Sequence, residues 1–192
     1  MNDAVNPCAT AAGWAVFATA VGHCGLAWGP RGLRCVRLPE ADGSAQRLRS
    51  RFAREFASLP ECEPAAWPTA VASAVEGVQA LLAGEPRDLR EIVLDPGGLS
   101  DFQLRLYTTA RAIAPGQVRT YGDIAEELGD KTLARAVGQA LGANPFAPVV
   151  PCHRVMGARG WQGGFSAPGG VALKLRMLAI EGAQPGGQAQ LF

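Results

Sequence analysis

The chain has 192 residues, 48% of them hydrophobic and 18% charged, with a formal net charge of +1. It is long and apolar enough to bury the cores of two small domains, and it lacks the strong basic excess that would by itself indicate nucleic-acid binding. The charge is uneven, since residues 1–96 hold 9 basic and 11 acidic side chains and residues 97–192 hold 9 and 6. If the chain binds a polyanion, we expect the second half to do so.

Cysteine usage and the N-terminus bear on the compartment. Five cysteines, an odd number without regular spacing, favour reducing surroundings over a disulfide framework. The apolar stretch at residues 14–21 is short and lacks a basic leader, so it predicts neither a secretory signal nor a membrane span. We therefore expect a cytoplasmic protein without membrane contact. A metal is not expected, because no Cys-x-x-Cys pair occurs among the candidate zinc ligands Cys8, His23, Cys24, Cys35 and Cys62.

The first half predicts a mixed α/β unit. Three short strands are separated by glycine turns, of which Gly29–Gly32 is the clearest, and two helices and a closing strand follow. The predicted strands are Trp14–Ala20, His23–Trp28, Leu33–Leu38 and Glu91–Leu94, and the predicted helices are Ser44–Phe56 and Thr69–Leu82.

A linker at Asp95–Gly98 separates the two halves. Ser100 then begins a helix with Gln103 at the capping-box position, and Pro115 follows its end. We expect one domain at residues 1–96 and another at residues 97–183. The Gly- and Gln-rich residues 184–192 are predicted to be a disordered tail.

Two short helices with a tight glycine turn come next. Thr120 and Asp123 form a capping box for a first helix, and a second apolar stripe runs over Leu133–Leu141. The pattern predicts a helix-turn-helix, and an ordinary helical hairpin fits it equally well. The outward side of the second helix carries one long cation among small residues that let a backbone approach a partner, namely Arg135 with Ala134 and Gly138.

One cysteine lies in a polar interruption of an apolar run, where residues Pro151–Val155 read Pro-Cys-His-Arg-Val. A thiol reacts as the thiolate, and His153 and Arg154 stand beside Cys152 to take its proton or favour its charge. The segment Val149–Val155 predicts a buried strand or an extended loop. On this pair of residues alone, an inert core cysteine is the alternative.

A glycine-rich loop follows at Gly163–Gly170, before a helix predicted at Val171–Glu181. Free backbone amides, the Ser166 hydroxyl and the Phe165 ring would suit a planar polar ligand. A plain surface loop is the alternative reading.

Together these segments resemble the O6-alkylguanine-DNA alkyltransferases, also called methylated-DNA-protein-cysteine methyltransferases. The resemblance runs from about Asp101 to Gly182. It rests on four motifs at the family's spacing, which are Tyr121-Gly122, Arg135-Ala136-Val137-Gly138, Asn144-Pro145 and Pro151-Cys152-His153-Arg154-Val155. It implies an α+β fold, with a ribonuclease-H-like α/β domain followed by a winged helix-turn-helix domain that carries the acceptor cysteine. It also implies DNA repair by irreversible, stoichiometric transfer of the alkyl group from O6-alkylguanine in double-stranded DNA, and it leaves O4-alkylthymine open as a second substrate.

The same resemblance assigns the reacting residues. Cys152 is similar to the family's alkyl acceptor, and His153, through a water, together with Glu181 resembles the relay that draws off its proton. Tyr121 resembles the residue that disturbs the target phosphate and hydrogen-bonds the extruded base. Asn144 resembles the hinge between the recognition helix and the active-site segment.

The base-binding residues also follow from the resemblance. Arg135 resembles the finger that takes the place of the extruded base in the stack. Ser166, Phe165 and the backbone near Val155 resemble the guanine pocket. The loop departs from some relatives by carrying Ala167-Pro168 before its glycine pair, which weakens the assignment of Ser166 and Phe165.

The expected chemistry agrees with the resemblance. A thiol reaches an O6-alkyl group only if the nucleotide is flipped out of the duplex, which requires roughly a few kcal/mol. In-line attack by the thiolate gives a thioether, which has no easy route to hydrolysis or exchange, so Cys152 is spent after one event. We expect a monomer that needs no cofactor and no metal.

Two other functional classes stay open at this point. A non-enzymatic reader of alkylated DNA shares the scaffold but lacks the acceptor cysteine, so Cys152 argues against it. A cysteine hydrolase would use Cys152 and His153 as a dyad. Neighbouring residues on an extended strand point to opposite sides, which disfavours direct pairing, and a hydrolase would turn over.

The last five residues read Gln-Ala-Gln-Leu-Phe. They resemble the short peptide by which bacterial repair and replication proteins dock on the replication sliding clamp, with Gln188, Leu191 and Phe192 as the contacts. A tail without function is the alternative, because five residues are a short motif.

Overall fold

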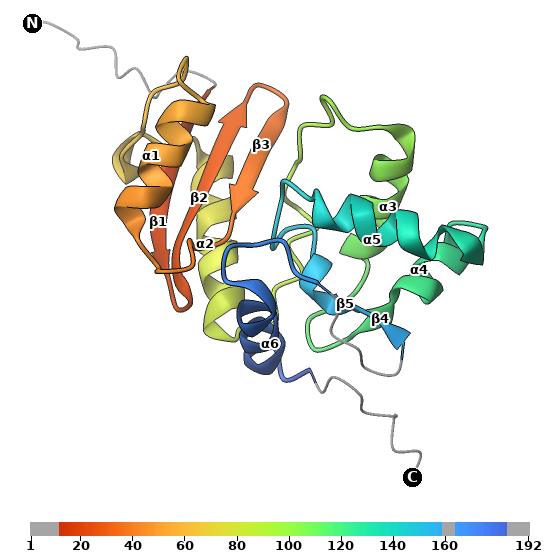
Figure 1. The fold of residues 1–192 in the computed structure, drawn as a ribbon. Helices are drawn as coiled ribbons and strands as arrows, with labels where there is room; N and C mark the ends of the chain where they lie inside the picture. Colours follow the sequence, from red (N-terminus) through yellow and green to blue (C-terminus); the bar gives the residue numbers. More distant parts are fainter. Residues whose placement is uncertain (1–11, 159–163, 184–192) are drawn as a thin grey trace, which may run out of the picture.

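The structure is a computed structural model that describes residues 12–158 and 164–183 (Figure 1). The first half is built on an antiparallel sheet in the order β1-β2-β3. Its strands are β1 (Gly13–Thr19), β2 (Gly22–Gly29) and β3 (Gly32–Arg37), which confirms the first three predicted strands to within one residue at each end.

Each face of this sheet is covered by one helix (Figure 1). Because side chains alternate across a strand, Trp14 packs toward α1 (Ala45–Glu55) and its neighbour Ala15 packs toward α2 (Thr69–Ala83). Both helices match the predicted ranges. The first half is therefore a three-layered α/β unit with a core on either side of the sheet.

The strand predicted at Glu91–Leu94 does not form. A single bridge, to Leu33, joins this segment to the sheet. The Arg111 side chain takes one carbonyl of this segment and two just before it, so these are not available to a ladder. Its guanidinium donates at 2.8–2.9 Å to the carbonyls of Leu89, Arg90 and Ile92.

The second half is mainly helical and has a core of its own. Its first three helices are α3 (Asp101–Arg111), α4 (Tyr121–Glu127) and α5 (Ala134–Gly142), and the last two lie side by side as the predicted helical pair. The remaining short elements and the last helix are η1 (Pro64–Ala66), β4 (Arg119–Thr120), η2 (Lys131–Leu133), η3 (Cys152–Arg154), β5 (Val155–Met156) and α6 (Gly170–Ile180).

Both predicted capping boxes are confirmed. Ser100 accepts from the Gln103 amide while the Gln103 side chain accepts from the Ser100 amide, and Thr120 and Asp123 do the same at the start of α4. Each box satisfies two backbone N–H groups that the first turn of a helix leaves unpaired.

The segment Val149–Val155 is neither a strand nor an extended loop over its whole length. Its centre is the 3-10 turn η3, and only its end belongs to β5. The Val150 carbonyl accepts from the Cys152 amide and from the Asn144 side chain, both at 2.8 Å, so it is not available to a neighbouring strand. The argument that strand geometry separates Cys152 from His153 therefore does not hold.

The two halves meet around α6 and β3. Leu173 and Met177 of α6 belong to the core between the sheet and α2, and the Val36 amide of β3 donates to the Pro145 carbonyl at 2.7 Å. This contact brings the end of β3 beside the loop that follows α5. The segment that carries Cys152 therefore lies near the boundary between the halves.

The described cysteines are not all reduced. Cys24, Cys35 and Cys152 are free thiols, whereas Cys62 is disulfide-bonded, so the expectation of reduced cysteines is wrong at this position. Spacing along a chain does not reveal which sulfurs meet in the fold. Within residues 12–158 and 164–183, no helix is long and apolar enough to cross a membrane, and no three potential metal-binding side chains gather. The tail predicted at residues 184–192 lies outside the described residues.

Candidate functional site

The Cys152 thiol begins the turn η3 and is 8% exposed. Burial raises its pKa, while hydrogen bonding by Asn144, the positive charge of Lys174 and the His153 backbone amide act in the opposite direction. Burial therefore keeps the thiol protonated at rest. The groups around it are those that would favour a thiolate once a base takes the proton.

A buried ion-pair group lies directly behind this thiol. Glu181, just after α6, meets the next two residues of η3. Its carboxylate lies 2.8 Å from His153 Nε2 and accepts two hydrogen bonds from Arg154, at 2.8 and 2.9 Å. Arg154 also donates to the Ile113 carbonyl at 2.6 Å. Two segments far apart in the sequence are thus fixed to each other by charge-assisted hydrogen bonds.

Protonation within this group follows from the same contacts. Burial alone would raise the pKa of Glu181, but hydrogen bonds from His153 and Arg154 outweigh it and lower the pKa to about 2. Burial also lowers the pKa of His153, although Glu181 acts in the opposite direction. The lowered pKa keeps the His153 ring neutral. An ionised carboxylate accepts the proton on Nε2, so Nδ1 carries the lone pair. Nδ1 has no hydrogen-bond partner among the described residues and is therefore available as a base.

Asn144 connects the end of α5 to the cysteine segment. Its side-chain amide donates to the Val150 carbonyl at 2.8 Å, and its carbonyl accepts from the Phe146 amide at 2.9 Å. With both ends of the side chain used, Asn144 holds the backbone on either side of the turn. A movement of α5 would therefore reach Cys152 through this residue.

Lys174 is a site residue that the sequence reading missed. It is fully buried on α6, its Nζ donates to the Val155 carbonyl at 2.7 Å, and its charge is felt at Cys152. Burial lowers the pKa of Lys174, and the charge of Cys152 works against that lowering. Helical spacing could have found it, because Lys174 stands one turn before buried Met177 and two turns before Glu181.

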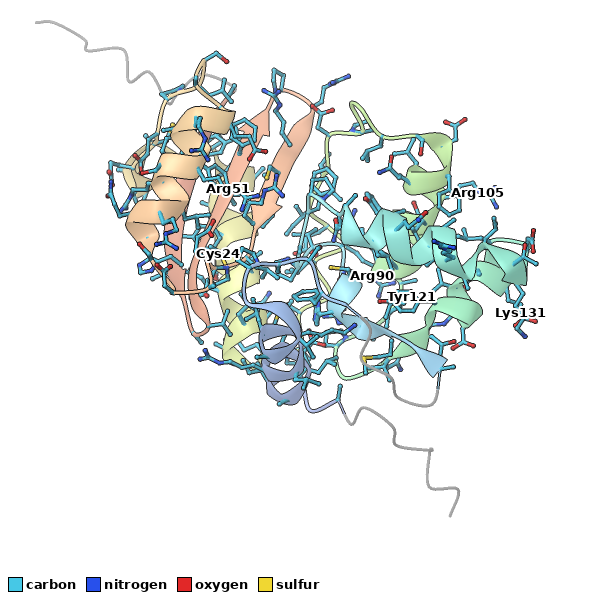
Figure 2. The ribbon with its side chains drawn as sticks, viewed as in Figure 1. Cys24, Arg51, Arg90, Arg105, Tyr121 and Lys131 are labelled. Atoms are coloured by element: carbon cyan, nitrogen blue, oxygen red, sulfur yellow. The ribbon has the colours of Figure 1, made fainter. Side chains whose placement is uncertain are left out.

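The paired helices α4 and α5 present the other predicted residues. Tyr121 begins α4 (Figure 2) and is half-buried. Burial raises the pKa of its hydroxyl, and the charge of nearby Cys152 acts in the same direction to a smaller extent. Gly138 of α5 lies against it, since an added Cβ there would be 3.8 Å from the Tyr121 ring. Ala134 is partly buried against the core of the second half. Arg135 is exposed and makes no ion pair with the described residues.

The loop before α6 completes the site. The Ser166 hydroxyl donates to the Gly142 carbonyl at 2.6 Å, which ties the loop to the end of α5. A small pocket of about 30 Å³ brings together most of the predicted residues, being lined by Tyr121, Gly138, Leu141, Gly142, Cys152, Gly164, Phe165 and Ser166. Val155 lies behind it with a buried side chain, and Arg135 and Ala134 lie outside it. The arrangement can present a thiol, a phenol and a hydroxyl to one flat polar ligand.

Known proteins resemble this chain in both sequence and structure. The family model described as 6-O-methylguanine DNA methyltransferase, DNA binding domain, matches residues 101–183. A methylated-DNA--protein-cysteine methyltransferase of Mycolicibacterium paratuberculosis is 47% identical over 114 residues, which are 59% of this chain and 67% of the relative. A DNA base-flipping protein of Thermus thermophilus is 47% identical over 108 residues, 56% of this chain and 71% of the relative. The crystal structure of Mycobacterium tuberculosis OGT in complex with DNA matches with a TM-score of 0.68 at 32% identity, covering 88% of this chain and 92% of that one.

Proposed function

This chain belongs to the methylated-DNA--protein-cysteine methyltransferase family, and from that premise we propose how its own residues carry the reaction. The protein repairs DNA by moving the alkyl group of O6-alkylguanine onto one of its cysteines. We assign Cys152 as the acceptor. The observation that carries this assignment is a free thiol in the Tyr121 pocket, backed by a neutral His153 with an unused Nδ1.

The other described cysteines fit the role poorly. Cys24 and Cys35 are free but lie in the core of the first half, where burial raises the pKa of each to about 12. Neither lines the pocket that holds Cys152, and Cys62 is disulfide-bonded. A thiolate is the nucleophile, so these three residues are disfavoured.

The transfer step balances with the groups in place. His153 Nδ1 takes the thiol proton, directly or through a water, and ionised Glu181 stabilises the resulting imidazolium. The sulfur of Cys152 forms a bond to the alkyl carbon as the bond from that carbon to O6 breaks, and the electron pair stays on guanine. Tyr121 donates a proton to the base as charge develops there. The thioether that remains cannot be hydrolysed easily, so each molecule acts once.

Base extrusion is assigned to the helix-turn-helix. The exposed side of α5 would enter the groove, where the small residues Ala134 and Gly138 allow close approach and Arg135 fills the vacated stack. Phe165, Ser166 and the backbone near Val155 would hold the flipped guanine. The exposure of Arg135 and the half-buried position of Tyr121 support this division.

The finer architecture is also part of the proposal. The mixed α/β fold matches that of the related structure, and we assign residues 1–96 to a ribonuclease-H-like domain and residues 97–183 to a winged helix-turn-helix domain. The pair of helices α4 and α5 next to the short β4-β5 pair supports the second assignment. A DNA substrate is consistent with a cytoplasmic protein that acts as a monomer.

The tail is proposed as a docking peptide for the sliding clamp. Its contacts Gln188, Leu191 and Phe192 lie outside the described residues, so the proposal rests on the sequence alone. Deleting Leu191 and Phe192 is expected to abolish retention on immobilised clamp in a pull-down. Unchanged retention would end the idea.

The reaction itself is tested by intact mass and peptide mapping after mixing the protein with a slight excess of duplex that contains one O6-methylguanine. We expect one added methyl group, on Cys152 alone, and no further gain. An unchanged mass with tight DNA binding would instead indicate a non-enzymatic reader. Multiple turnovers would indicate a hydrolase, and either result would overturn the role given to Cys152.

A further inference from the structure

A second cavity is lined by Cys152 but not by Tyr121. It has a volume of about 280 Å³ and shares Cys152, Phe165 and Ser166 with the smaller pocket. Its far wall comes from the first half of the chain, which contributes Arg37 of β3 and Arg51 of α1. Cys152 therefore stands between a pocket in the helix-turn-helix half and a cavity that reaches across the boundary between the halves.

The charged side chains that line the cavity are all positive among the described residues. Two of the described side chains that line it are guanidiniums and none is acidic. Arg37 donates to Glu55 at 2.9 Å and Arg51 to Glu40 at 3.3 Å, but neither carboxylate lines the cavity. These pairs leave donors unused, since a guanidinium carries five N–H groups.

Arg37 in particular has spare hydrogen-bonding capacity. Its Nε is buried beside the Cys35 thiol, which hydrogen-bonds the guanidinium, and its Nη2 donates to Glu55. Its Nη1 donates to no described residue. A ligand that brings an acceptor into the cavity can use a donor that the fold leaves free.

We propose that this cavity receives the distal part of longer O6-alkyl groups, and that Arg37 and Arg51 favour groups that end in a carboxylate. The inference rests on the proposed function, with guanine in the Tyr121 pocket and Cys152 as the acceptor. The thiolate attacks the first carbon of the alkyl group, so the rest of a longer chain must lie beside the sulfur. A methyl group is too short to use the cavity, whereas an acid-terminated chain of a few carbons can reach its arginine wall.

The test compares acids with their neutral amides. Single-turnover rates are measured on duplexes carrying O6-carboxymethylguanine, O6-(3-carboxypropyl)guanine and the two corresponding carboxamides. Each acid and amide differ in charge but hardly in shape, so their rate ratio cancels changes in folding, DNA binding and basal transfer. We expect the longer acid to react about tenfold faster than its amide, which is the discrimination of one charge-assisted hydrogen bond.

Variants locate the effect. The double variant Arg37→Gln/Arg51→Gln should bring the acid-to-amide ratio close to one, and Arg51→Gln alone should lower it in part. Arg49→Gln is the matched control, because Arg49 is also an arginine of α1 that pairs with a glutamate, Glu61 at 2.8 Å, but it does not line the cavity. That variant should keep the wild-type ratio.

The outcomes separate this inference from the proposed function. A wild-type ratio near one, or a ratio that the double variant leaves unchanged, overturns the arginine wall while methyl transfer to Cys152 still stands. Failure to transfer even a methyl group to Cys152 overturns the proposed function itself. The O6-methylguanine duplex is therefore run beside every acid and amide.

Discussion

Arg154 and Arg135 carry the same side chain in opposite surroundings. Arg154 is 1% exposed, and its hydrogen bonds to Glu181 and to the Ile113 carbonyl satisfy it within the fold. Arg135 is exposed on α5 and has no ion pair with the described residues. A buried charge must be paired inside the molecule, whereas an exposed one can be kept for a partner. The reactive group is thus fixed by folding, and the groups assigned to DNA are left uncommitted.

The largest test of this contrast removes the buried carboxylate. Glu181→Gln leaves Arg154 buried with a weaker acceptor and should lower the free energy of unfolding by about 3 kcal/mol, measured by denaturant titration. The control Glu61→Gln breaks an exposed pair with Arg49 and should change it by less than about 1 kcal/mol. Equal losses in the two variants would contradict the assigned importance of burial.

The wild type and Glu181→Gln should also differ in how their stability depends on pH. Folding lowers the pKa of Glu181 from 4.5 to about 2, so its contribution to stability is complete above about pH 4.5 and is lost as the pH falls toward 2. The melting temperature of the wild type should therefore fall more steeply over this window than that of Glu181→Gln. Parallel curves would show that the carboxylate is not held ionised by its partners.

Exposed Arg135 should affect extrusion of the base from duplex DNA and not the alkyl-transfer step. Arg135→Ala is expected to slow methyl transfer from duplex DNA by about tenfold or more, because extrusion is no longer offset by a stack-filling side chain. Its rate with free O6-benzylguanine, which needs no extrusion, should stay the same. Lys131→Ala is the control, since Lys131 is an exposed cation in the same helical hairpin (Figure 2). It already pairs with Glu126 at 3.1 Å. A matching loss with the free base would place Arg135 in the chemical step.

Lys174 tests whether a second buried cation acts on the Cys152 thiol. Lys174→Met removes a positive charge near Cys152, so the apparent pKa of the thiol should rise, and transfer at neutral pH should slow by about tenfold and recover at alkaline pH. The measurement is the pH-rate profile with free O6-benzylguanine. Arg176→Met removes the same charge from the exposed side of α6, where Arg176 donates to the Ala20 carbonyl, and should leave the profile unchanged. An unshifted profile for Lys174→Met would reduce Lys174 to a packing role.

The smallest expected effect is on stability, from removing either of the two capping boxes. Ser100→Ala and Thr120→Ala should each lower the free energy of unfolding by about 1 kcal/mol. Only the second is expected to slow transfer from duplex DNA as well, because its helix begins with Tyr121. Equal transfer rates would show that the position of Tyr121 does not depend on its cap.

Local signals in the sequence were sufficient for most of the fold. Strand alternation, capping boxes and glycine turns act over a few residues, so the first three strands, the helices and the helical pair could be predicted. The predicted strand at Glu91–Leu94 is wrong because Arg111, far along the chain, takes the carbonyls. Cys62 is misjudged for the same reason, since the pairing of sulfurs is a property of the fold.

The site was predictable where motifs are contiguous. Cys152 and His153 are adjacent, and Tyr121-Gly122 and Asn144-Pro145 are short motifs that resemble those of the family. Lys174, by contrast, belongs to no motif and could be found only by its helical spacing from Met177 and Glu181, and the two arginines of the second cavity come from the other half of the chain. Only the meeting of β3, α1 and the loop before α6 brings them to the thiol.

The reaction permanently changes which charges the interior near Cys152 can carry. Arg154 is paired with Glu181, so the negative charge that buried Lys174 can favour is a thiolate at Cys152. A sulfur that has become a thioether can never supply that charge again. At rest the fresh and the used molecule carry the same charges, because the fresh thiol is protonated, but the used one can no longer form the thiolate that Lys174 favours. A repair protein that works once would in this way carry an internal mark of having worked.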